Sequence, residues 1–290
     1  VVSIDEAYMD ISGSQRLQGN PETVAMDIKN NIQKSLGLTC SVGVAPGKFL
    51  AKVASDMDKP DGLTVIRPQD VDQFIRHLPV QKVPGVGKKT YLNLEAMGIK
   101  YLGDIKKFPE KMLLDRLGKF GHRLINLSSG IDQSRVTPWS PHKSISSERT
   151  LSQDTRDKKV LHKYMLNQSE EIARQLRKAG FRARTITLKI KHADFKQFTR
   201  SKTINTPTRS SETIYRHAAD LLENYPLTQQ IRLIGVGTSG FISTNRPVQL
   251  NLFDRIEQND KTWEKVDRTV ETIAQKFGRD AIKRGTLKDH

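Results

Sequence analysis

The chain is 290 residues long, a length that predicts two or three modules and excludes a single small core. Its 48 Lys and Arg residues against 32 Asp and Glu give a formal net charge of +16, which favours a polyanionic partner over a basic surface that serves solubility alone. Cys40 is the only cysteine, so an intramolecular disulfide and a cysteine zinc cluster are excluded, and a reducing intracellular compartment is expected. No run of about 18 apolar residues is present, so no membrane partner is expected.

The first 66 residues alternate between strand-like and helix-like stretches, distinguished by the spacing of their apolar residues. In chain order, they are an extended stretch over 1–12, a helix over 21–37, a buried strand over 38–45, a helix over 47–57 and a short strand over 63–66. Since strands and helices alternate, an α+β layer is predicted.

The rest of the chain divides into four parts. Short helices joined by glycine-containing turns are predicted over 67–135, and the Pro- and Ser-containing stretch 136–146 is typical of an interdomain linker. Residues 147–242 predict a second α+β domain with the order strand, helix, two strands, helix, strand, in which basic residues outnumber acidic ones. A tail follows over 243–290. The predicted fold class is therefore α+β, with several domains.

Two adjacent carboxylates, Asp5 and Glu6, interrupt the first extended stretch. Successive strand residues point to opposite faces, so the two side chains can converge on one metal ion only where the backbone turns. Converging carboxylates and triphosphate oxygens are hard ligands suited to Mg²⁺, which assists in-line phosphoryl transfer. An edge strand with two solvated acids is the alternative, and the local sequence does not separate the two interpretations.

Lys59 follows the predicted helix over 47–57 and precedes Pro60 and Gly62. Such a turn can hold a basic side chain at the mouth of a sheet, where Lys acts as a point charge for β- and γ-phosphates. A helix C-terminus also favours Lys without any ligand, so this motif is compatible with a structural role.

Residues 84–89, with the sequence Pro-Gly-Val-Gly-Lys-Lys, are typical of the hairpin in a helix-hairpin-helix. Gly85 and Gly87 let the backbone approach another molecule closely, and amides at the start of the next helix can receive a DNA phosphate. Lys88 and Lys89 add positive charge at this point, although a Gly-x-Gly turn between helices also occurs without a ligand.

Taken together and in this order, the motifs resemble those of the Y-family DNA polymerases, the translesion enzymes, in their bacterial DinB or polymerase IV branch. The resemblance extends through Phe253 and rests on five stretches: "SIDEAYMDISG", "CSVGVAPGKFLAKVASDMDKPDGLTVI", "VPGVGKKTYLNLEAMGI", "FTRSKTI" and "IRLIGVG". It implies that residues 1–66 are the C-terminal part of the palm, 67–135 the thumb and 147–242 the little finger.

The resemblance also implies roles for individual residues. Asp5 and Glu6 would be the second and third carboxylates of the catalytic metal site, which holds two Mg²⁺ ions, and Lys59 would contact the triphosphate. Contacts to DNA would come from the thumb hairpin and the little finger, through Gly85, Gly87, Lys88, Lys89, Thr199, Arg200, Ser201 and Arg232.

In this family the first metal-binding aspartate, the steric gate against ribonucleotides and the fingers precede the "SIDEA" motif. The sequence begins without Met and without that region, and no Asp-x-Asp near aromatic residues replaces it. It therefore predicts a truncated polymerase, and these residues alone are not expected to extend a primer.

Gln249, Leu252 and Phe253 reproduce the Gln-x-x-Leu-Phe peptide by which bacterial polymerases bind the β subunit of the sliding clamp. In such a peptide two apolar anchors enter a groove while the Gln amide bonds nearby backbone. The peptide follows the predicted little finger, where the resemblance implies a clamp-binding segment.

A second feature of the tail is a helical repeat of apolar residues, which predicts an amphipathic helix over 263–277. Docking of this helix on its own protein is favoured over a separate partner site. The repeat consists of Trp263, Val266, Val270, Ile273 and Phe277.

The resemblance implies a low-fidelity, template-directed DNA polymerase that adds dNTPs to a primer 3′ end by a two-metal mechanism. Its expected partners are primer-template DNA, dNTP and the sliding clamp, and it is expected to be a monomer in the bacterial cytoplasm, associated with the nucleoid. A catalytically incomplete DNA- and clamp-binding fragment is the alternative. A palm-type nucleotide cyclase would share the carboxylates but leaves the hairpin and the clamp peptide unexplained.

Overall fold

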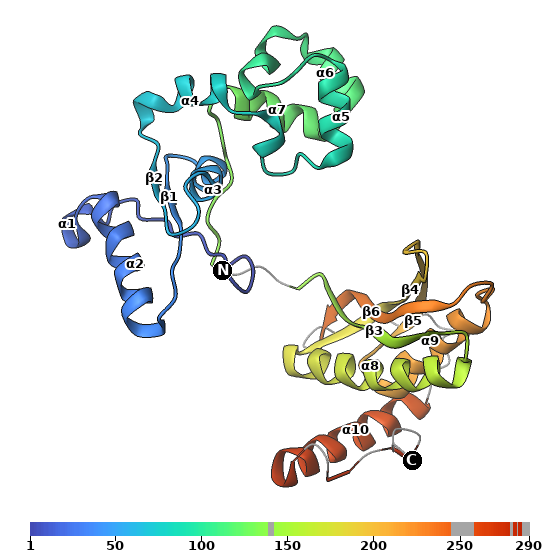
Figure 1. The fold of residues 1–290 in the computed structure, drawn as a ribbon. Coiled ribbons are helices and arrows are strands. Elements are labelled where there is room, and N and C mark those ends of the chain that lie inside the picture. The colour runs from blue at the N-terminus through green and yellow to red at the C-terminus, as the bar shows by residue number, and fades with distance from the viewer. Residues whose placement is uncertain (139–141, 245–257, 279–280, 283, 286–290) are drawn as a thin grey trace. The chain divides into compact units, whose positions relative to one another are not determined.

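The structure, a computed structural model, divides the chain into two compact units, Val1–Ser140 (unit 1) and Pro141–His290 (unit 2). Both units combine helices with a β-sheet, which confirms the predicted α+β class (Figure 1). No helix of the described residues is long and apolar enough to cross a membrane. The described residues are 1–138, 142–244, 258–278, 281–282 and 284–285.

Unit 1 contains a small parallel sheet with a helix packed directly on it. Strands β1 (Val42–Val44) and β2 (Leu63–Val65) pair in parallel, and α3 (Lys48–Met57) lies between them in sequence, because a parallel pair needs a long crossover. A Cβ atom on Gly43 would lie 2.1 Å from the backbone oxygen of Ala51, so the strand has no room for a side chain under α3. This close packing fixes α3 against the sheet.

The strand predicted over 1–12 is absent, and this prediction is wrong. The backbone N–H groups of Val2 and Ser3 both donate to the carbonyl oxygen of Glu6, at 2.8 and 3.3 Å, which closes a turn. A strand requires a hydrogen-bonded neighbour, and in the described part of unit 1 β1 and β2 pair only with each other. Ile4 therefore remains fully exposed despite its apolar side chain.

The helix predicted over 21–37 is confirmed as α2 (Pro21–Leu36), which follows the short α1 (Gln15–Gln18). The side chain of Asn20 accepts a hydrogen bond from the Thr23 N–H at 2.8 Å and caps the start of the helix. Gly37 ends it in the left-handed conformation, with φ 67°.

The remainder of unit 1 is helical, as predicted, and shares one apolar core with α3. Leu94, Ile99, Leu102 and Leu124 are fully buried there and belong to the same apolar cluster as Val53 of α3. The elements in chain order are η1 (Pro68–Asp70), α4 (Val71–His77), η2 (Val80–Lys82), α5 (Lys88–Ala96), η3 (Leu102–Lys107), α6 (Glu110–Leu117) and α7 (Lys119–Ser128).

Unit 2 has a four-stranded antiparallel sheet with the spatial order β3-β6-β4-β5 and two helices on one face. The buried residues of the sheet, such as Ile186, Leu188 and Ile190, share one core with Ile172 and Ile214 of the helices. The predicted order of elements is confirmed: β3 (Ser144–Thr155), α8 (Lys158–Ala179), β4 (Phe181–His192), β5 (Gln197–Thr208), α9 (Ser211–Glu223) and β6 (Ile231–Ser243).

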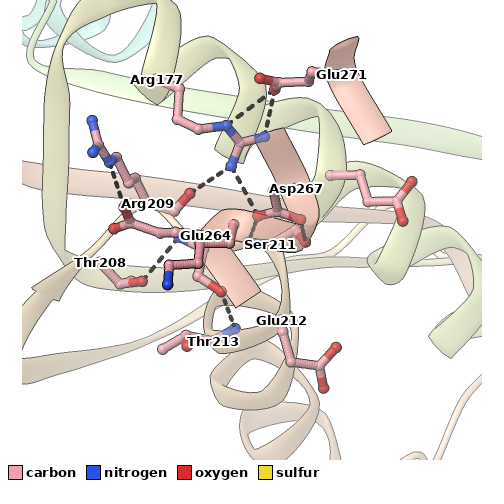
Figure 2. Close-up of polar contacts among 12 residues, drawn as sticks. Arg177, Thr208, Arg209, Ser211, Glu212, Thr213, Glu264, Asp267 and Glu271 are labelled. Carbon is pink, nitrogen blue, oxygen red and sulfur yellow. Dashed lines mark hydrogen bonds and ion pairs between the residues drawn. The ribbon is translucent and has the colours of Figure 1, made fainter. Parts of the chain in front are cut away.

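The helix predicted over 263–277 is present as part of α10 (Gln258–Phe277), on the side of α8 that faces away from the sheet (Figure 1). It docks on its own unit through hydrogen bonds and ion pairs of its acidic side chains (Figure 2), beside which Trp263, Val270 and Ile273 are half-buried. Val266 is 41% exposed and Phe277 72% exposed, whereas Glu264 and Asp267 are buried. The most deeply buried side chains that attach α10 are therefore acidic.

Candidate active site and nucleic-acid surfaces

The turn at residues 2–6 carries the two carboxylates of the predicted metal site. The Ser3 hydroxyl donates to Oδ1 of Asp5 at 2.6 Å, and this hydrogen bond is the main reason why the pKa of the Asp5 carboxyl is lowered. The positive charges of Lys59 and Lys52 act in the same direction. Asp5 therefore remains ionised at neutral pH, as a metal ligand requires.

Glu6 and Lys59 are joined by a chain of ion pairs of alternating charge. Nζ of Lys52 lies 2.6 Å from Oε1 of Glu6 and 2.9 Å from Oδ2 of Asp56, and Nζ of Lys59 lies 2.5 Å from Oδ1 of Asp56. The hydrogen bond to Glu6 raises the pKa of Lys52, and the hydrogen bond from Lys59 lowers the pKa of Asp56. The structure thus places the carboxylate turn and the Lys59 turn in one polar cluster.

Lys52 and Asp56 were missed by the sequence reasoning. They lie one helical turn apart on α3, and Lys59 follows three residues after Asp56. The sequence signal that could have found them is the i, i+4, i+7 spacing of Lys52, Asp56 and Lys59, in which the charges alternate. Lys59, the last of the three, was already predicted to contact phosphate.

The turn offers two carboxylates of the kind that a largely hydrated magnesium ion takes as ligands. Among the described residues no group of three or more His, Cys, Asp or Glu side chains could hold a metal. Mg²⁺ is commonly held by one or two carboxylates together with water and substrate phosphates, and Asp5 and Glu6 supply two such carboxylates. Both side chains are accessible, since Asp5 is exposed and the Glu6 side chain is 42% exposed.

The hairpin at residues 84–87 ends in a helix start that has no side-chain cap. Gly85 has φ +99°, and a Cβ atom there would lie 2.9 Å from Phe120, so the turn depends on glycine. Gly87 is the N-cap of α5, and no atom lies within 4 Å of the position a Cβ would take. Lys88 and Lys89 are exposed beside it. The uncapped amides, open space and positive charge suit a phosphate group.

The face of the unit 2 sheet turned away from α8 and α9, here called the open face, carries hydroxyl groups and lysines. Thr187 on β4 pairs with Ser201 on β5 and with Gly237 on β6, and the hydroxyls of Thr187 and Ser201 lie 2.9 Å apart. Thr199 lies on the same face opposite Lys189. Gly237 adds no side chain to this face.

The structure separates Arg200 from Thr199 and Ser201. Arg200 pairs with Leu188, a core residue, so its side chain starts from the helix-covered face, and its guanidinium lies 5.8 Å from the Tyr225 ring. Arg232 lies 4.8 Å from the Phe195 ring and 3.8 Å from Asp154.

Lys191 also contacts the Phe195 ring, at 5.0 Å, and the sequence reasoning missed it together with Thr187 and Lys189. The alternation in "RTITLKIKH", which directs Thr185, Thr187, Lys189 and Lys191 to one face, predicts this surface.

The predicted clamp-binding residues Gln249, Leu252 and Phe253 lie outside the described residues.

Three family models match the chain in succession. Residues 1–56 match the impB/mucB/samB family, residues 68–99 match the IMS family HHH motif, and residues 142–252 match the impB/mucB/samB family C-terminal domain. The matched stretches contain the carboxylate turn, the glycine hairpin and the unit 2 sheet.

Curated relatives and solved structures agree with these matches. The chain is 43% identical over 240 residues to a DNA polymerase IV of Methanoculleus marisnigri, covering 82% of this chain and 66% of the relative. It is 34% identical over 287 residues to a DNA polymerase IV of Desulfatibacillum aliphaticivorans, covering 99% and 72%. A Y-family DNA polymerase chimera matches with a TM-score of 0.75 and 32% identity, over 84% of this chain and 71% of that one. An insertion ternary complex of Dbh DNA polymerase matches with a TM-score of 0.52 and 28% identity, over 82% and 68%.

Proposed function

The chain belongs to the DinB or DNA polymerase IV branch of the Y-family of DNA polymerases. We therefore propose that it contains palm, thumb and little-finger parts of a translesion polymerase. In this proposal residues 1–66 are the palm part, 67–135 the thumb, 136–146 a linker and 147–242 the little finger. The tail over 243–290 follows. The polymerase adds dNTPs to the 3′ end of a primer paired with a template strand.

One observation carries the proposal for the active site. Glu6 and Lys59 are 53 positions apart in sequence, yet the ion pairs through Lys52 and Asp56 bring them into one cluster. A carboxylate that can hold a metal and a lysine that can hold a phosphate therefore share one site, which suits a nucleoside triphosphate bound with a divalent cation.

The residues of this cluster have separate roles in the proposed reaction. Asp5 and Glu6 would hold Mg²⁺, and Lys59 would neutralise the β- and γ-phosphates of the dNTP as a point charge. When bound, two Mg²⁺ ions would stabilise the charge on the attacking and leaving oxygens of the phosphoryl transfer. The hairpin at Gly85 and Gly87 and the open face of unit 2 would bind phosphates of primer-template DNA, so the chain itself contributes position and charge rather than base recognition.

Primer extension tests the catalytic assignment. Asp5→Ala and Glu6→Ala are expected to reduce dNTP incorporation by the native polymerase by roughly two orders of magnitude or more, because the metal loses a ligand while the phosphate charge develops. Duplex binding and the free energy of unfolding should stay unchanged, since both side chains are accessible. Glu22→Ala, which removes an acid paired with Arg67 on the surface, is the matched control. Full activity of both site variants would refute the metal assignment.

Tethering to the sliding clamp is a separate part of the proposal and rests on Gln249, Leu252 and Phe253 in the sequence. Burial of a Leu and a Phe side chain contributes roughly 3 to 6 kcal/mol before ordering costs. Leu252→Ala with Phe253→Ala is therefore expected to abolish clamp binding in calorimetry and to leave single-nucleotide insertion unchanged. Undiminished binding would place the clamp contact elsewhere in the protein.

A further inference from the structure

Lys52 has two carboxylate partners, and they belong to different functional parts of the cluster. Its Nζ atom lies 2.6 Å from Glu6, on the carboxylate turn, and 2.9 Å from Asp56, on its own helix. Asp56 in turn has two lysine partners, because Lys59 binds its other oxygen at 2.5 Å. In the absence of ligands the charges of Glu6, Lys52, Asp56 and Lys59 therefore sum to zero, and each of the two end residues is bound to an inner one.

The two inner residues of the ion-pair chain, Lys52 and Asp56, and the two outer ones, Glu6 and Lys59, differ in how a ligand affects them. The Lys52 side chain is 27% exposed, against 42% for Glu6, 43% for Asp56 and 55% for Lys59, so Lys52 is the group least open to a ligand from solvent. A divalent cation would approach Glu6, and a triphosphate would approach Lys59. Lys52 repels a cation at its neighbour Glu6, and Asp56 repels a triphosphate at its neighbour Lys59, so each inner residue opposes the ligand of the outer residue it binds.

We infer that, without ligands, Lys52 is the counter-ion of Glu6 and Asp56 is the counter-ion of Lys59. When a cation binds Glu6 and a triphosphate binds Lys59, Lys52 and Asp56 pair with each other. The inference rests on the proposed function of Glu6 and Lys59. A cation at Glu6 repels the Lys52 ammonium group, which keeps its hydrogen bond to Asp56. A triphosphate withdraws Lys59 from Asp56, which then pairs with Lys52 alone. At each stage every charged group of the four has a partner of opposite charge.

This exchange couples the two ligands. When the triphosphate binds Lys59, Asp56 loses that partner and attracts Lys52 more strongly. Lys52 then competes less for Glu6, so a cation binds Glu6 more tightly. By thermodynamic reciprocity a cation at Glu6 also favours the triphosphate at Lys59. Without nucleotide, Lys52 competes with the cation, so the empty site is expected to bind divalent metal weakly.

Titration of the chain with Mn²⁺ in the absence of nucleotide tests the inference, with free Mn²⁺ followed by electron paramagnetic resonance. Lys52→Met is expected to raise Mn²⁺ affinity about fivefold, since unit charges about 4 Å apart near water interact by about 1 kcal/mol. Asp56→Asn is expected to lower the affinity severalfold, because Lys52 then has Glu6 as its only full counter-charge. In the double variant, Asp56→Asn should have no further effect, because the lysine through which it acts is gone.

The double variant distinguishes this exchange from a simple sum of charges. If Asp56→Asn lowers Mn²⁺ affinity equally with and without Lys52, the effects are additive and the inference is wrong. A decrease for Lys52→Met would also overturn it, since that result means that Lys52 supports the metal site rather than competing with it. Arg76→Met breaks an exposed pair with Asp72 at the same i, i+4 spacing, and it should leave Mn²⁺ binding unchanged.

Glu6→Gln separates failure of the inference from failure of the proposed function. Loss of Mn²⁺ binding in Glu6→Gln supports the metal assignment, whatever the Lys52 and Asp56 variants do. Unchanged binding in Glu6→Gln would refute the metal assignment and the inference with it. Denaturation curves of all variants are expected to lie close to the wild type, because partly exposed ion pairs contribute little to stability.

Discussion

Arg177 on α8 donates a hydrogen bond from Nη1 to Oδ2 of Asp267 on α10 at 2.9 Å, and the two side chains are only 9% and 7% exposed. Figure 2 shows the same guanidinium reaching Glu271 as well, and Nη1 also donates to the backbone oxygen of Arg209. Asp267 accepts two further hydrogen bonds from the backbone N–H and the hydroxyl of Ser211, at the start of α9. The carboxylate thus ties α10 to α8 and α9 at once.

The first prediction concerns this carboxylate. Asp267→Asn keeps the shape of the side chain but leaves Arg177 buried with less negative charge around it, so the free energy of unfolding of unit 2 should fall by about 1 to 3 kcal/mol. Urea denaturation followed by far-ultraviolet circular dichroism measures the change. Lys265→Gln, an exposed charge change on the same helix, is expected to have little effect. Equal stability of Asp267→Asn and the wild type would mean that α10 is held by other contacts.

Asp260, two turns earlier on α10, leads to the opposite prediction. Burial raises the pKa of this carboxyl above its ordinary 3.8, although hydrogen bonds from Thr208 and Thr213 oppose the rise. A raised carboxyl pKa means that the folded state binds more protons than the unfolded state, so this group contributes less stability as pH rises from about 3.8 through its folded pKa.

Asp260→Asn removes the buried charge but leaves an amide oxygen that can accept from the two threonines. We expect it to be as stable as the wild type, or more stable, at neutral pH, with the difference between the two proteins shrinking as pH falls toward 4. Urea denaturation of both proteins between pH 4 and pH 7 checks the sign. The quantity compared is the free energy of unfolding of Asp260→Asn minus that of the wild type. A smaller value at pH 7 than at pH 4 would contradict burial as the cause of the raised pKa.

The third prediction uses the two faces of the unit 2 sheet. Lys191 lies on the open face, whereas Lys202 pairs with the core residue Ile186 and reaches toward Asp220 on α9 at 3.5 Å. Lys191→Gln should weaken binding of duplex DNA of any sequence and reduce the slope of log affinity against log salt by about 1. Lys202→Gln makes the same charge change on the other face of the sheet. It should change the duplex affinity and the salt slope less than Lys191→Gln does. Similar effects of both variants would show that the open face has no special role in DNA binding.

The fourth prediction separates the two glycines of the hairpin. Gly87→Ala adds a methyl group into open space at φ −85°, so the free energy of unfolding should change by less than about 0.5 kcal/mol. Duplex affinity should nevertheless fall, because the methyl group occupies the position where a phosphate would approach the amides of α5.

Gly85→Ala is the informative comparison, since its φ of +99° and the contact with Phe120 make the substitution destabilising by about 1 to 3 kcal/mol. Fluorescence anisotropy with labelled duplex, alongside thermal unfolding, measures both effects. Unchanged duplex affinity in Gly87→Ala would remove the helix start from the DNA-binding surface.

Much of the fold follows from local sequence. Asn20, Pro21 and Gly37 mark the two ends of α2, since capping and the left-handed glycine depend on neighbouring residues alone. The alternation over 184–192 determines that β4 is a half-buried strand and directs Thr187 and Lys189 to its open face. The carboxylate pair and the glycine hairpin are also visible in sequence, because each lies within one turn of the chain.

Tertiary structure decided the features that depend on distant partners. Residues 1–12 were predicted to be extended but form no strand, because a strand exists only where a neighbour accepts its hydrogen bonds. The apolar repeat predicted α10, but not the side by which it docks. That side was decided by Arg177 and Arg209, which lie on other elements and pair with Asp267 and Glu264. Helical periodicity describes one helix, whereas charge pairing depends on what folding places opposite it.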